Sequence, residues 1–447
     1  MDHFTNGKGE MEELERKAAS GTALTLLLAS MLTLALGIQP AAAGGAIYIR
    51  PDGSVDPLTA PIQKNGSKYT LANSICDSIV IQKDNIIFDG AGYTIQGTVS
   101  LYTKGIELVG RRNVTLTNIS TVGFYYGFYL YSCSGNSILG NVMADNEYGI
   151  RLDFSSNNSI SGNTITRNSG GVFLLFSFGN HVSGNNIVAN SGEGVYMPLS
   201  FNNTVSGNNV TNNNEGVILA DSSTTTISGN NIAANELGIF VGSSSTNVIL
   251  ENDLSANKYG IFLTDGSSSN LIYHNNFLNN TYQAYDFSRS PFSPPGLKPS
   301  ICSWDDGYPS GGNYWSDYAD EDLRSGPYQN VSGNDDIWDH PYEIDVANID
   351  NYPLVDIWSR FPRTLSELKT KVEEFGSEGG IDNQGIVKSL IAKLNPAQKL
   401  VDKGKVDEAA HVLASFVIQV QELTETHITK EAAVILVKSA EYIRSHF

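Results

Sequence analysis

The sequence predicts a mainly β protein, a right-handed parallel β-helix of about nine coils followed by a small C-terminal helical bundle. Three observations support this fold class. A short polar motif around a β-branched residue recurs seven times in register, every 22 or 23 residues. Apolar residues alternate with polar ones inside each repeat, which is the period of a β-strand. Beyond residue 362 the apolar spacing changes to three and four residues, the period of a helix.

Residues 1–43 read as an export signal. An uncharged stretch of 18 residues, 21–38, follows Arg16 and Lys17, and a run of small residues at 41–44 suits a signal peptidase. The stretch is also long enough to remain as a membrane anchor. In either case we expect the rest of the chain to be extracellular or on the cell surface, with membrane contact only through this segment if it is not cleaved.

Residues 44–290 hold the repeats, which are marked by two columns of asparagine. The first column is Asn141, Asn163, Asn185, Asn208, Asn230, Asn252 and Asn275. The second column is Asn146, Asn168, Asn190, Asn213, Asn235, Asn257 and Asn280. Asparagine tolerates left-handed backbone angles, and stacked amides form hydrogen-bonded ladders. We therefore expect both properties at these turns.

Two strands per repeat are visible in the pattern of apolar residues. The first carries Ile138, Ile160, Val182, Val205, Ile227, Val248 (offset by one position) and Ile272, and the second carries pairs such as Ile150 with Leu152. A leucine-rich repeat has a similar period but needs a leucine scaffold and a helical return, which these Asn-, Ser- and Thr-rich copies do not supply. Earlier coils begin at residues 84 and 113, and residues 46–80 are expected to cover the open end.

The segments 47–57 (IYIRPDGSVDP), 84–95 (DNIIFDGAGYTI) and the SGNNI-type coils resemble NosD-like proteins. They are also similar to the carbohydrate-binding and sugar-hydrolysis (CASH) domain, particularly in archaeal surface proteins. This resemblance, over residues 46 to about 290, implies an exported pectin-lyase-like β-helix. It implies either sugar binding or a role in assembling a copper site.

An outward-facing column of mostly aromatic residues is the candidate binding site. Its proposed ligand contacts are Tyr129, Arg151, Phe173, Tyr196, Phe240, Phe262 and Tyr285, with Ile218 in the same column. Members one coil apart are about 4.8 Å from each other, so their rings form a strip on which a sugar can stack. The alternative is that the C-terminal part of the chain or a partner covers this strip.

Catalytic and copper-binding patterns are weak. Candidate carboxylates such as Asp153, Asp221 and Asp265 recur with the repeat, as ordinary turn residues do, and no catalytic pair stands out. The soft copper ligands Met143, Met197, His181 and His274 are scattered over four coils. No catalytic residue is therefore assigned.

Residues 291–362 form an acidic, aromatic-rich segment that is expected to cap the last coil. This block resembles the one that often follows archaeal NosD-like helices. Where relatives read like GDGIGDTPY, this chain has residues 334–342, NDDIWDHPY. No cofactor is assigned with certainty, but the oxygen ligands of Asp335, Asp336 and Asp339 make calcium a candidate, and the alternative is a plain aromatic cap.

Residues 363–447 predict helices at 365–375, 382–394, 396–403, 405–424 and 428–446. Gly376, the Asn395–Pro396 pair and Gly404 are expected to separate them. Residues 379–447 resemble the FIMAH module of secreted microbial proteins, on the segment 380–395 (GIDNQGIVKSLIAKLN) and the Gly404 turn. The resemblance implies an accessory module without an agreed chemistry.

The composition excludes one class of partner. The net charge of the chain is −19, and no basic stripe is available to neutralise nucleic-acid phosphates. We expect an exported, non-enzymatic protein that binds a polysaccharide or another cell-surface component. The alternatives are a polysaccharide lyase or glycoside hydrolase on the same scaffold, and a NosD-like periplasmic accessory protein of a copper enzyme.

Overall fold

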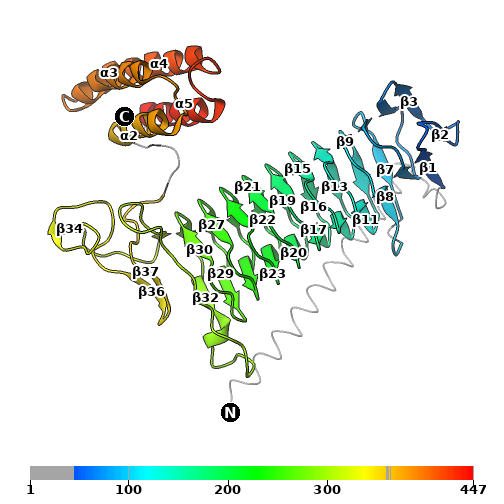
Figure 1. Ribbon diagram of the computed structural model, residues 1–447, viewed down its shortest axis with the longest axis horizontal. Helices are drawn as coiled ribbons and strands as arrows, with labels where there is room; N and C mark the ends of the chain where they lie inside the picture. The colour runs from blue at the N-terminus through cyan, green and yellow to red at the C-terminus, as the bar shows by residue number, and fades with distance from the viewer. Residues whose placement is uncertain (1–44, 99, 359–361, 363, 446–447) are drawn as a thin grey trace, which may run out of the picture. The chain divides into compact units, whose positions relative to one another are not determined.

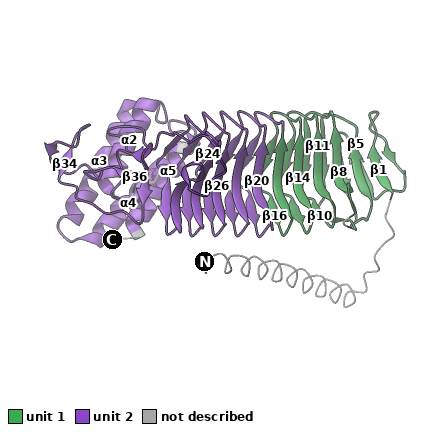
Figure 2. Cartoon of the chain, turned by 90° about the horizontal axis from the view of Figure 1, so that it is seen from below, with its two compact units in different colours: residues 1–175 green, residues 176–447 purple. Residues whose placement is uncertain are grey.

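The computed structural model describes residues 45–98, 100–358, 362 and 364–445 (Figure 1). The expected signal peptide or anchor of residues 1–43 lies outside this part of the chain. Two compact units divide the chain between Leu175 and Phe176, within the repeats (Figure 2). The first unit is called unit 1 below, and the second, which ends at the C-terminus, unit 2.

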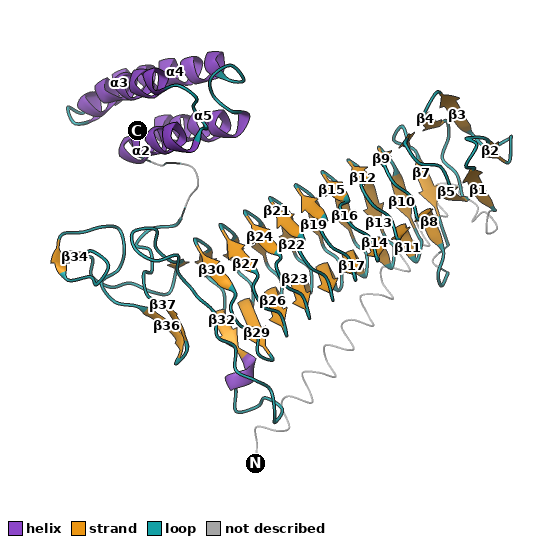
Figure 3. Ribbon diagram, viewed as in Figure 1, coloured by secondary structure: helices purple, strands orange, loops and turns teal. Residues whose placement is uncertain are grey.

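One coil of the repeat contains three short strands joined by tight turns. In residues 137–153 these are β12 (Ser137–Leu139), β13 (Val142–Ala144) and β14 (Tyr148–Asp153). Each strand pairs in parallel with its equivalent one coil away, so that Ile138 lies beside Ile160. One side chain or more from every strand points inward, and Ile138, Met143 and Ile150 are all fully buried. The predicted parallel β-helix is therefore confirmed (Figure 3).

Unit 1 contains three sheets, named A, B and C. In spatial order, sheet A contains β2 (Val55–Asp56), β1 (Ala46–Ile49), β5 (Ser78–Ile81), β8 (Lys104–Val109), β11 (Tyr126–Tyr131), β14 and β17 (Gly170–Leu175). Sheet B contains β3 (Ile62–Asn65), β4 (Lys68–Leu71), β6 (Ile86–Asp89), β9 (Val114–Thr117), β12 and β15 (Ser159–Ser161). Sheet C contains β7 (Thr94–Gln96), β10 (Ser120–Val122), β13 and β16 (Thr164–Thr166).

Unit 2 repeats the arrangement. Sheet A here contains β20 (Glu193–Pro198), β23 (Glu215–Ala220), β26 (Leu237–Gly242), β29 (Tyr259–Thr264) and β32 (Tyr282–Asp286). Sheet B contains β18 (His181–Ser183), β21 (Thr204–Ser206), β24 (Thr226–Ser228), β27 (Val248–Leu250) and β30 (Leu271–Tyr273). Sheet C contains β19 (Asn186–Val188), β22 (Asn209–Thr211), β25 (Asn231–Ala233), β28 (Asp253–Ser255), β31 (Asn276–Leu278) and β33 (Tyr314–Trp315).

Three details of the coils differ from expectation. The alternation of apolar residues indicated two strands in each coil and missed the third. This missed strand belongs to sheet C and begins at the residue after the first asparagine column. Ile249, not Val248, continues the buried column of sheet B, because Ile227 pairs with Ile249 and no offset occurs. Residues 46–80 do not only cover the open end of the coils. Within this segment β4 pairs with β6 and β5 pairs with β8, so the segment is itself part of a coil.

The asparagine columns form the expected ladders, and their amides are buried. The Asn230 side-chain oxygen accepts hydrogen bonds from the backbone and side-chain nitrogens of Asn208, both at 2.9 Å. Its Nδ2 donates to the Val205 carbonyl and to the Asn252 side-chain oxygen, both at 2.9 Å. Each amide thus satisfies backbone groups that would otherwise be buried without partners. A third column that the sequence analysis missed contains Asn136, Asn158, Asn180, Asn203, Asn247 and Asn270.

The left-handed backbone angles do not fall on the laddered asparagines, contrary to expectation. They fall on the residue before, for example Gly207 (φ 62°) before Asn208 and Ala234 (φ 56°) before Asn235. The physical reason is that the turn itself needs the positive φ, whereas the following residue must point its amide inward. Glycine occupies the turn position before the first column in most coils because it adopts a positive φ without strain.

Residues after β32 close the C-terminal end of the coils in unit 2. After η1 (Phe287–Arg289), strand β33 adds to sheet C beside β31, and Asn313 accepts from Asn275 as the last member of the first ladder. The Trp315 ring stacks on Phe277, with ring centroids 4.2 Å apart. The rest of the segment contains β34 (Arg324–Ser325), β35 (Val331–Ser332), β36 (Tyr342–Asp345) and β37 (Asn348–Asp350). We call residues 300–358 the cap.

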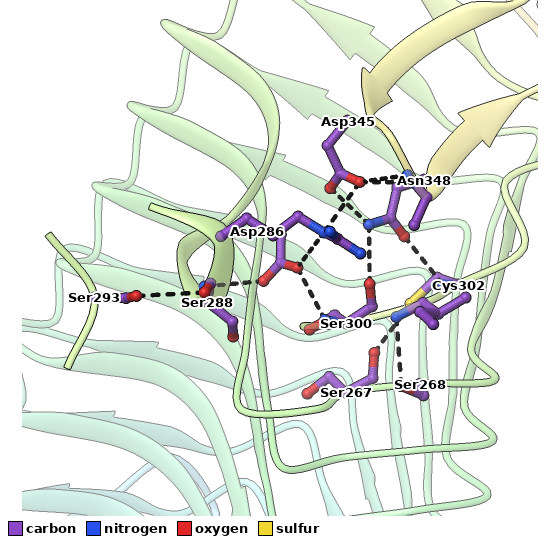
Figure 4. A network of polar contacts seen from close by, with 12 residues as sticks. Ser267, Ser268, Asp286, Ser288, Ser293, Ser300, Cys302, Asp345 and Asn348 are labelled. Atoms are coloured by element: carbon purple, nitrogen blue, oxygen red, sulfur yellow. Dashed lines mark hydrogen bonds and ion pairs between the residues drawn. The ribbon is translucent and has the colours of Figure 1, made fainter. Parts of the chain in front are cut away.

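A polar network fastens the cap to the end of sheet A (Figure 4). The Asn348 side chain accepts from the backbone of Cys302 at 3.0 Å and donates to the Ser300 carbonyl at 3.1 Å and to Asp345 at 2.7 Å. Asp286, the last residue of β32, accepts from the Ser300 backbone at 2.9 Å. The cap is therefore held by hydrogen bonds as well as by its tryptophans.

The C-terminal helices form a module with a core of its own. They are α2 (Leu365–Glu378), α3 (Gln384–Val401), α4 (Val406–Leu423) and α5 (Lys430–Ser445). Two expected breaks are wrong. α3 continues through Pro396 because Leu394 and Ala397, on either side of it, are both fixed in the core. α2 continues past Gly376 to end before Gly379 (φ 86°), and Gly376 is needed for the close approach of Val387.

Candidate functional site

The register of sheet A places the predicted ligand contacts in outward-facing columns. In unit 1, Tyr129 pairs with Arg151 and Arg151 with Phe173. In unit 2 the column runs Tyr196, Ile218, Phe240, Phe262 and Tyr285. The predicted contacts are all half-buried, while Ile218 is only 6% exposed. The structure therefore brings the predicted residues together within each unit, and ligand binding stays a prediction.

In unit 1 the column forms a cluster around an ion pair. Arg151 Nε donates to the Asp153 carboxylate at 2.9 Å, and the Tyr129 hydroxyl donates to the same carboxylate at 3.1 Å. The Arg151 guanidinium lies 4.7 Å from the centre of the Phe173 ring and 5.4 Å from that of Tyr126. Burial raises the pKa of the Tyr129 hydroxyl, and the Asp153 carboxylate raises it further. We call these five residues the arginine cluster.

In unit 2 the rings form a nearly continuous platform over three coils. Phe240 and Phe262 stack with their centroids 5.8 Å apart and 14° between their planes. Tyr259 and Tyr282 stack at 4.9 Å and 12°, and Phe262 lies 5.7 Å from Tyr285. We call these five rings the aromatic platform. Its flat, half-exposed faces are of the kind that bind the apolar face of a sugar ring.

Two carboxylates border the column at the other end of unit 2. Glu193 and Glu215 pair directly in register on β20 and β23, three residues before Tyr196 and Ile218. Burial raises the pKa of Glu215, and the charges of Glu193 and Glu236 raise it further. Burial also raises the pKa of the Tyr196 hydroxyl, and the negative charge of Glu193 raises it further. Glu236 is paired with Lys258 at 2.8 Å, whereas in the described part of the chain no ion pair involves Glu193 or Glu215.

The sequence analysis missed a second set of aromatic residues on this face. Tyr126 and Tyr148 are paired in unit 1, and Tyr259 and Tyr282 are paired in unit 2, in each case three residues before members of the predicted column. A signal was available, because Tyr148 and Tyr259 directly precede Gly149 and Gly260, which recur at the same period. They were overlooked because only one outward position per strand was considered.

A separate exposed apolar surface in unit 2 was also missed. It consists of Phe176, Phe178, Leu199 and Phe201, on the turns after β17 and β20, with exposed fractions between 37% and 51%. Phe176 and Leu199 hold positive φ angles of 46° and 52°, which are unfavourable for large side chains. Large apolar residues on both sides of the buried Ser177 and Ser200 are the sequence signal for it.

Two of the three aspartates proposed as calcium ligands accept backbone hydrogen bonds, and they accept them from separate parts of the cap. Asp339 accepts from the backbone nitrogens of Leu323 and Arg324 at 3.2 and 3.0 Å. Asp335 accepts from the backbone of Gly326 at 3.3 Å, and burial raises the pKa of Asp336. Within the described ranges, no group of three His, Cys, Asp or Glu side chains is placed to hold a metal ion. The structure therefore does not bring these aspartates together as a ligand set.

Calcium binding remains testable in solution. If Asp335 and Asp339 bind calcium, a chelator is expected to lower the melting temperature, and the double variant Asp335→Asn/Asp339→Asn should lose that response. The stabilisation follows mass action and reaches about 2.7 kcal/mol at a hundredfold excess over Kd. A melting temperature that changes with neither calcium nor chelator would contradict calcium binding. The two carboxylates would then serve only to accept hydrogen bonds from the backbone of the cap.

The soft side chains considered as copper ligands do not converge. Met143 and Met197 are fully buried in the core, and His181 is exposed on sheet B. The His274 ring stacks on Trp358 and its Nε2 lies 2.8 Å from the Ser310 carbonyl oxygen. Each of these side chains thus already has a structural environment, and the described residues do not assemble a soft-ligand site.

Three solved structures illustrate the similarity of the coils to known proteins. The periplasmic alginate epimerase AlgG is 16% identical, with a TM-score of 0.38 over 57% of this chain and 83% of its own. DFA-IIIase from Arthrobacter chlorophenolicus A6 is 16% identical, with a TM-score of 0.37 over 61% and 68%. Tailspike protein 2 of bacteriophage CBA120 is 15% identical, with a TM-score of 0.32 over 52% and 45%. These low scores support no conclusion on activity.

Family models match both parts of the chain. No curated protein matches the sequence. In the described part of the chain no helix is both long and apolar enough to cross a bilayer. The model of the FIMAH domain matches residues 365–445. The model described as periplasmic copper-binding protein (NosD) matches residues 59–241 and 190–320, more than half of the sequence. The chain therefore belongs to the NosD family, and it carries a FIMAH domain at its C-terminal end.

Proposed function

We propose that this NosD-family protein is exported and binds carbohydrate, without cleaving it, on the outer face of sheet A. The observation that carries the proposal is the aromatic platform, a set of stacked and half-exposed rings in register over three coils. Rings that served only stability would be expected to lie inside the coils, where Phe277 and Phe128 are fully buried. The family description as periplasmic supports the exported location.

A copper-related role is less well supported by these residues. The family description names copper binding, but the methionines are core residues and His274 is engaged with Trp358 and Ser310. Copper sites need thiolate, thioether or imidazole ligands that converge on one point. The described residues do not fit such a site, and we derive no copper chemistry from them.

The binding proposal is tested with one ring of the platform. Phe240→Ala is expected to weaken glycan binding about three- to tenfold, because it removes one stacking face worth about 0.5–1.5 kcal/mol. It should lower stability by less than the roughly 3–5 kcal/mol of a buried Phe→Ala change. The measurement is a glycan-array screen followed by titration of the best ligand, with a thermal melt of each variant.

Phe292→Ala is the matched control, since Phe292 is 87% exposed and lies outside the coils. It should bind glycan as the unchanged protein does. A large loss of stability in Phe240→Ala with binding intact would mean that the platform is a docking surface for another part of the chain or for a partner. Release of reducing ends or unsaturated products from a bound glycan would establish the alternative, a polysaccharide-cleaving enzyme.

A further inference from the structure

The cations beside the aromatic face of sheet A are already paired with carboxylates. Arg151 binds Asp153 at 2.9 Å, and Lys258 binds Glu236 at 2.8 Å. Lys104 pairs with Glu107 in the same way. The positive charge that each cation offers to an anionic ligand is therefore already offset in large part by its own carboxylate.

The carboxylates of this face, in contrast, are not all paired. Among the described residues, no ion pair is recorded for Glu193 or Glu215, which lie opposite each other in adjacent coils. Glu215 is half-buried, and the charges of Glu193 and Glu236 add to the effect of burial on its pKa. The face in unit 2 therefore carries unbalanced negative charge beside Tyr196.

This charge pattern selects between two classes of polysaccharide. Polyuronates and sulfated glycans are recognised through cations that are free to form charge-assisted hydrogen bonds. Here such a chain would meet Glu193 and Glu215 in a protein whose net charge is −19. An uncharged glycan is not repelled by these carboxylates. Its CH faces stack on the rings, and its hydroxyl groups can donate hydrogen bonds to the carboxylates.

We infer that the ligand of this face is an uncharged glycan, and not a polyuronate or a sulfated polysaccharide. The inference rests on the proposed function and names the substrate class of that site. The observation that carries it furthest is the pair Glu193 and Glu215, which lie in register on the same sheet and in the same unit as the aromatic platform.

The experiment compares acidic glycans with their neutral counterparts. Polygalacturonate, alginate and hyaluronate are printed on an array, each beside its carboxyl-reduced form, together with neutral glucans and mannans. We expect binding to neutral polymers, and at least tenfold weaker binding to each acidic polymer than to its reduced form at low ionic strength. The difference should narrow at about 0.15 M salt, where charges are screened beyond roughly 8 Å.

The double variant Glu193→Gln/Glu215→Gln tests the origin of the selectivity. It should keep its affinity for the neutral polymers and gain affinity for the acidic ones. Asp402→Asn, a change of the same kind on an exposed residue of the helical module, is the control and should change neither. An acidic polymer that binds as tightly as its reduced form, or more tightly, would overturn the inference while leaving carbohydrate binding in place. Binding to no glycan of either kind would overturn both.

Discussion

Replacing Asn230 by leucine is expected to destabilise the coils by roughly 3–6 kcal/mol, because several buried groups lose their partner at a cost of about 1–3 kcal/mol each. The backbone N–H and the side-chain NH2 of Asn208 both donate to the Asn230 oxygen. The Val205 carbonyl and the Asn252 side chain lose the donor that Asn230 supplies. Leucine has the same number of side-chain heavy atoms and the same branching as asparagine but offers no hydrogen bond to any of them.

Asn231→Leu is the matched control for this change. Asn231 is the next residue along the chain, it is exposed, and its side-chain nitrogen donates to the Asn209 side chain at 2.7 Å. Its loss should cost about 0.5–1 kcal/mol at most, as other surface changes do. Chemical denaturation of the two variants, followed by circular dichroism at the β-sheet minimum, measures the difference. Equal free energies of unfolding for the two variants would show that the hydrogen bonds of the ladder do not stabilise the coils.

The second large effect is expected at Asp350, which is fully buried in the cap. Its carboxylate accepts from the Asn313 backbone at 2.7 Å and from Trp315 Nε1 at 2.9 Å. Burial raises its pKa to about 7 in spite of these donors. In the unfolded chain the pKa is about 3.9, so between pH 4 and 7 the folded cap holds a proton that the unfolded chain has lost. Stability should therefore be highest in acid and fall as the pH rises, by about 4 kcal/mol in total from this group.

Asp350→Asn removes this titration. We expect it to lower stability at every pH, because an amide cannot accept from all the donors that face the two carboxylate oxygens. The difference in unfolding free energy between the unchanged protein and the variant should shrink as the pH rises from 4 to 7. Fluorescence of the buried Trp304 and Trp315 reports on the cap during the melt. A difference that stays constant across this range would mean that Asp350 is already ionised in the folded cap.

The sequence predicted the features that recur with the period and little of what does not. The asparagine columns and the outward parity of Phe240 follow from spacing alone, because every coil reports the same position again. The pairing of Trp315 with Phe277 does not recur, since the interval of 38 positions from Asn275 to Asn313 follows no repeat. Cap contacts such as those of Asp350 could therefore not be predicted.

Errors at particular residues have physical causes of the same kind. The left-handed angle was assigned to Asn208 when it belongs to Gly207, because asparagine suits both a turn and a ladder and the sequence does not say which role it has. Pro396 was expected to end a helix, and the core contacts of Leu394 and Ala397 override that local preference. The arginine cluster was seen only in part, because Asp153 lies on the same strand as Arg151 and not in the predicted column.

The ladders also determine how the length of this protein can change in evolution. The Asn208 amide bonds to the equivalent amide of Asn230, 22 residues later, and Asn230 bonds to Asn252 at the same interval. Deleting residues 209–230 would bring Asn208 to that same interval from Asn252, with every rung of the ladder made again. A deletion of half a coil would instead place polar residues inside and leave the rungs without partners. Natural variants of the coil region are thus expected to gain or lose whole coils, so that the outer face of sheet A grows or shrinks by one strand at a time.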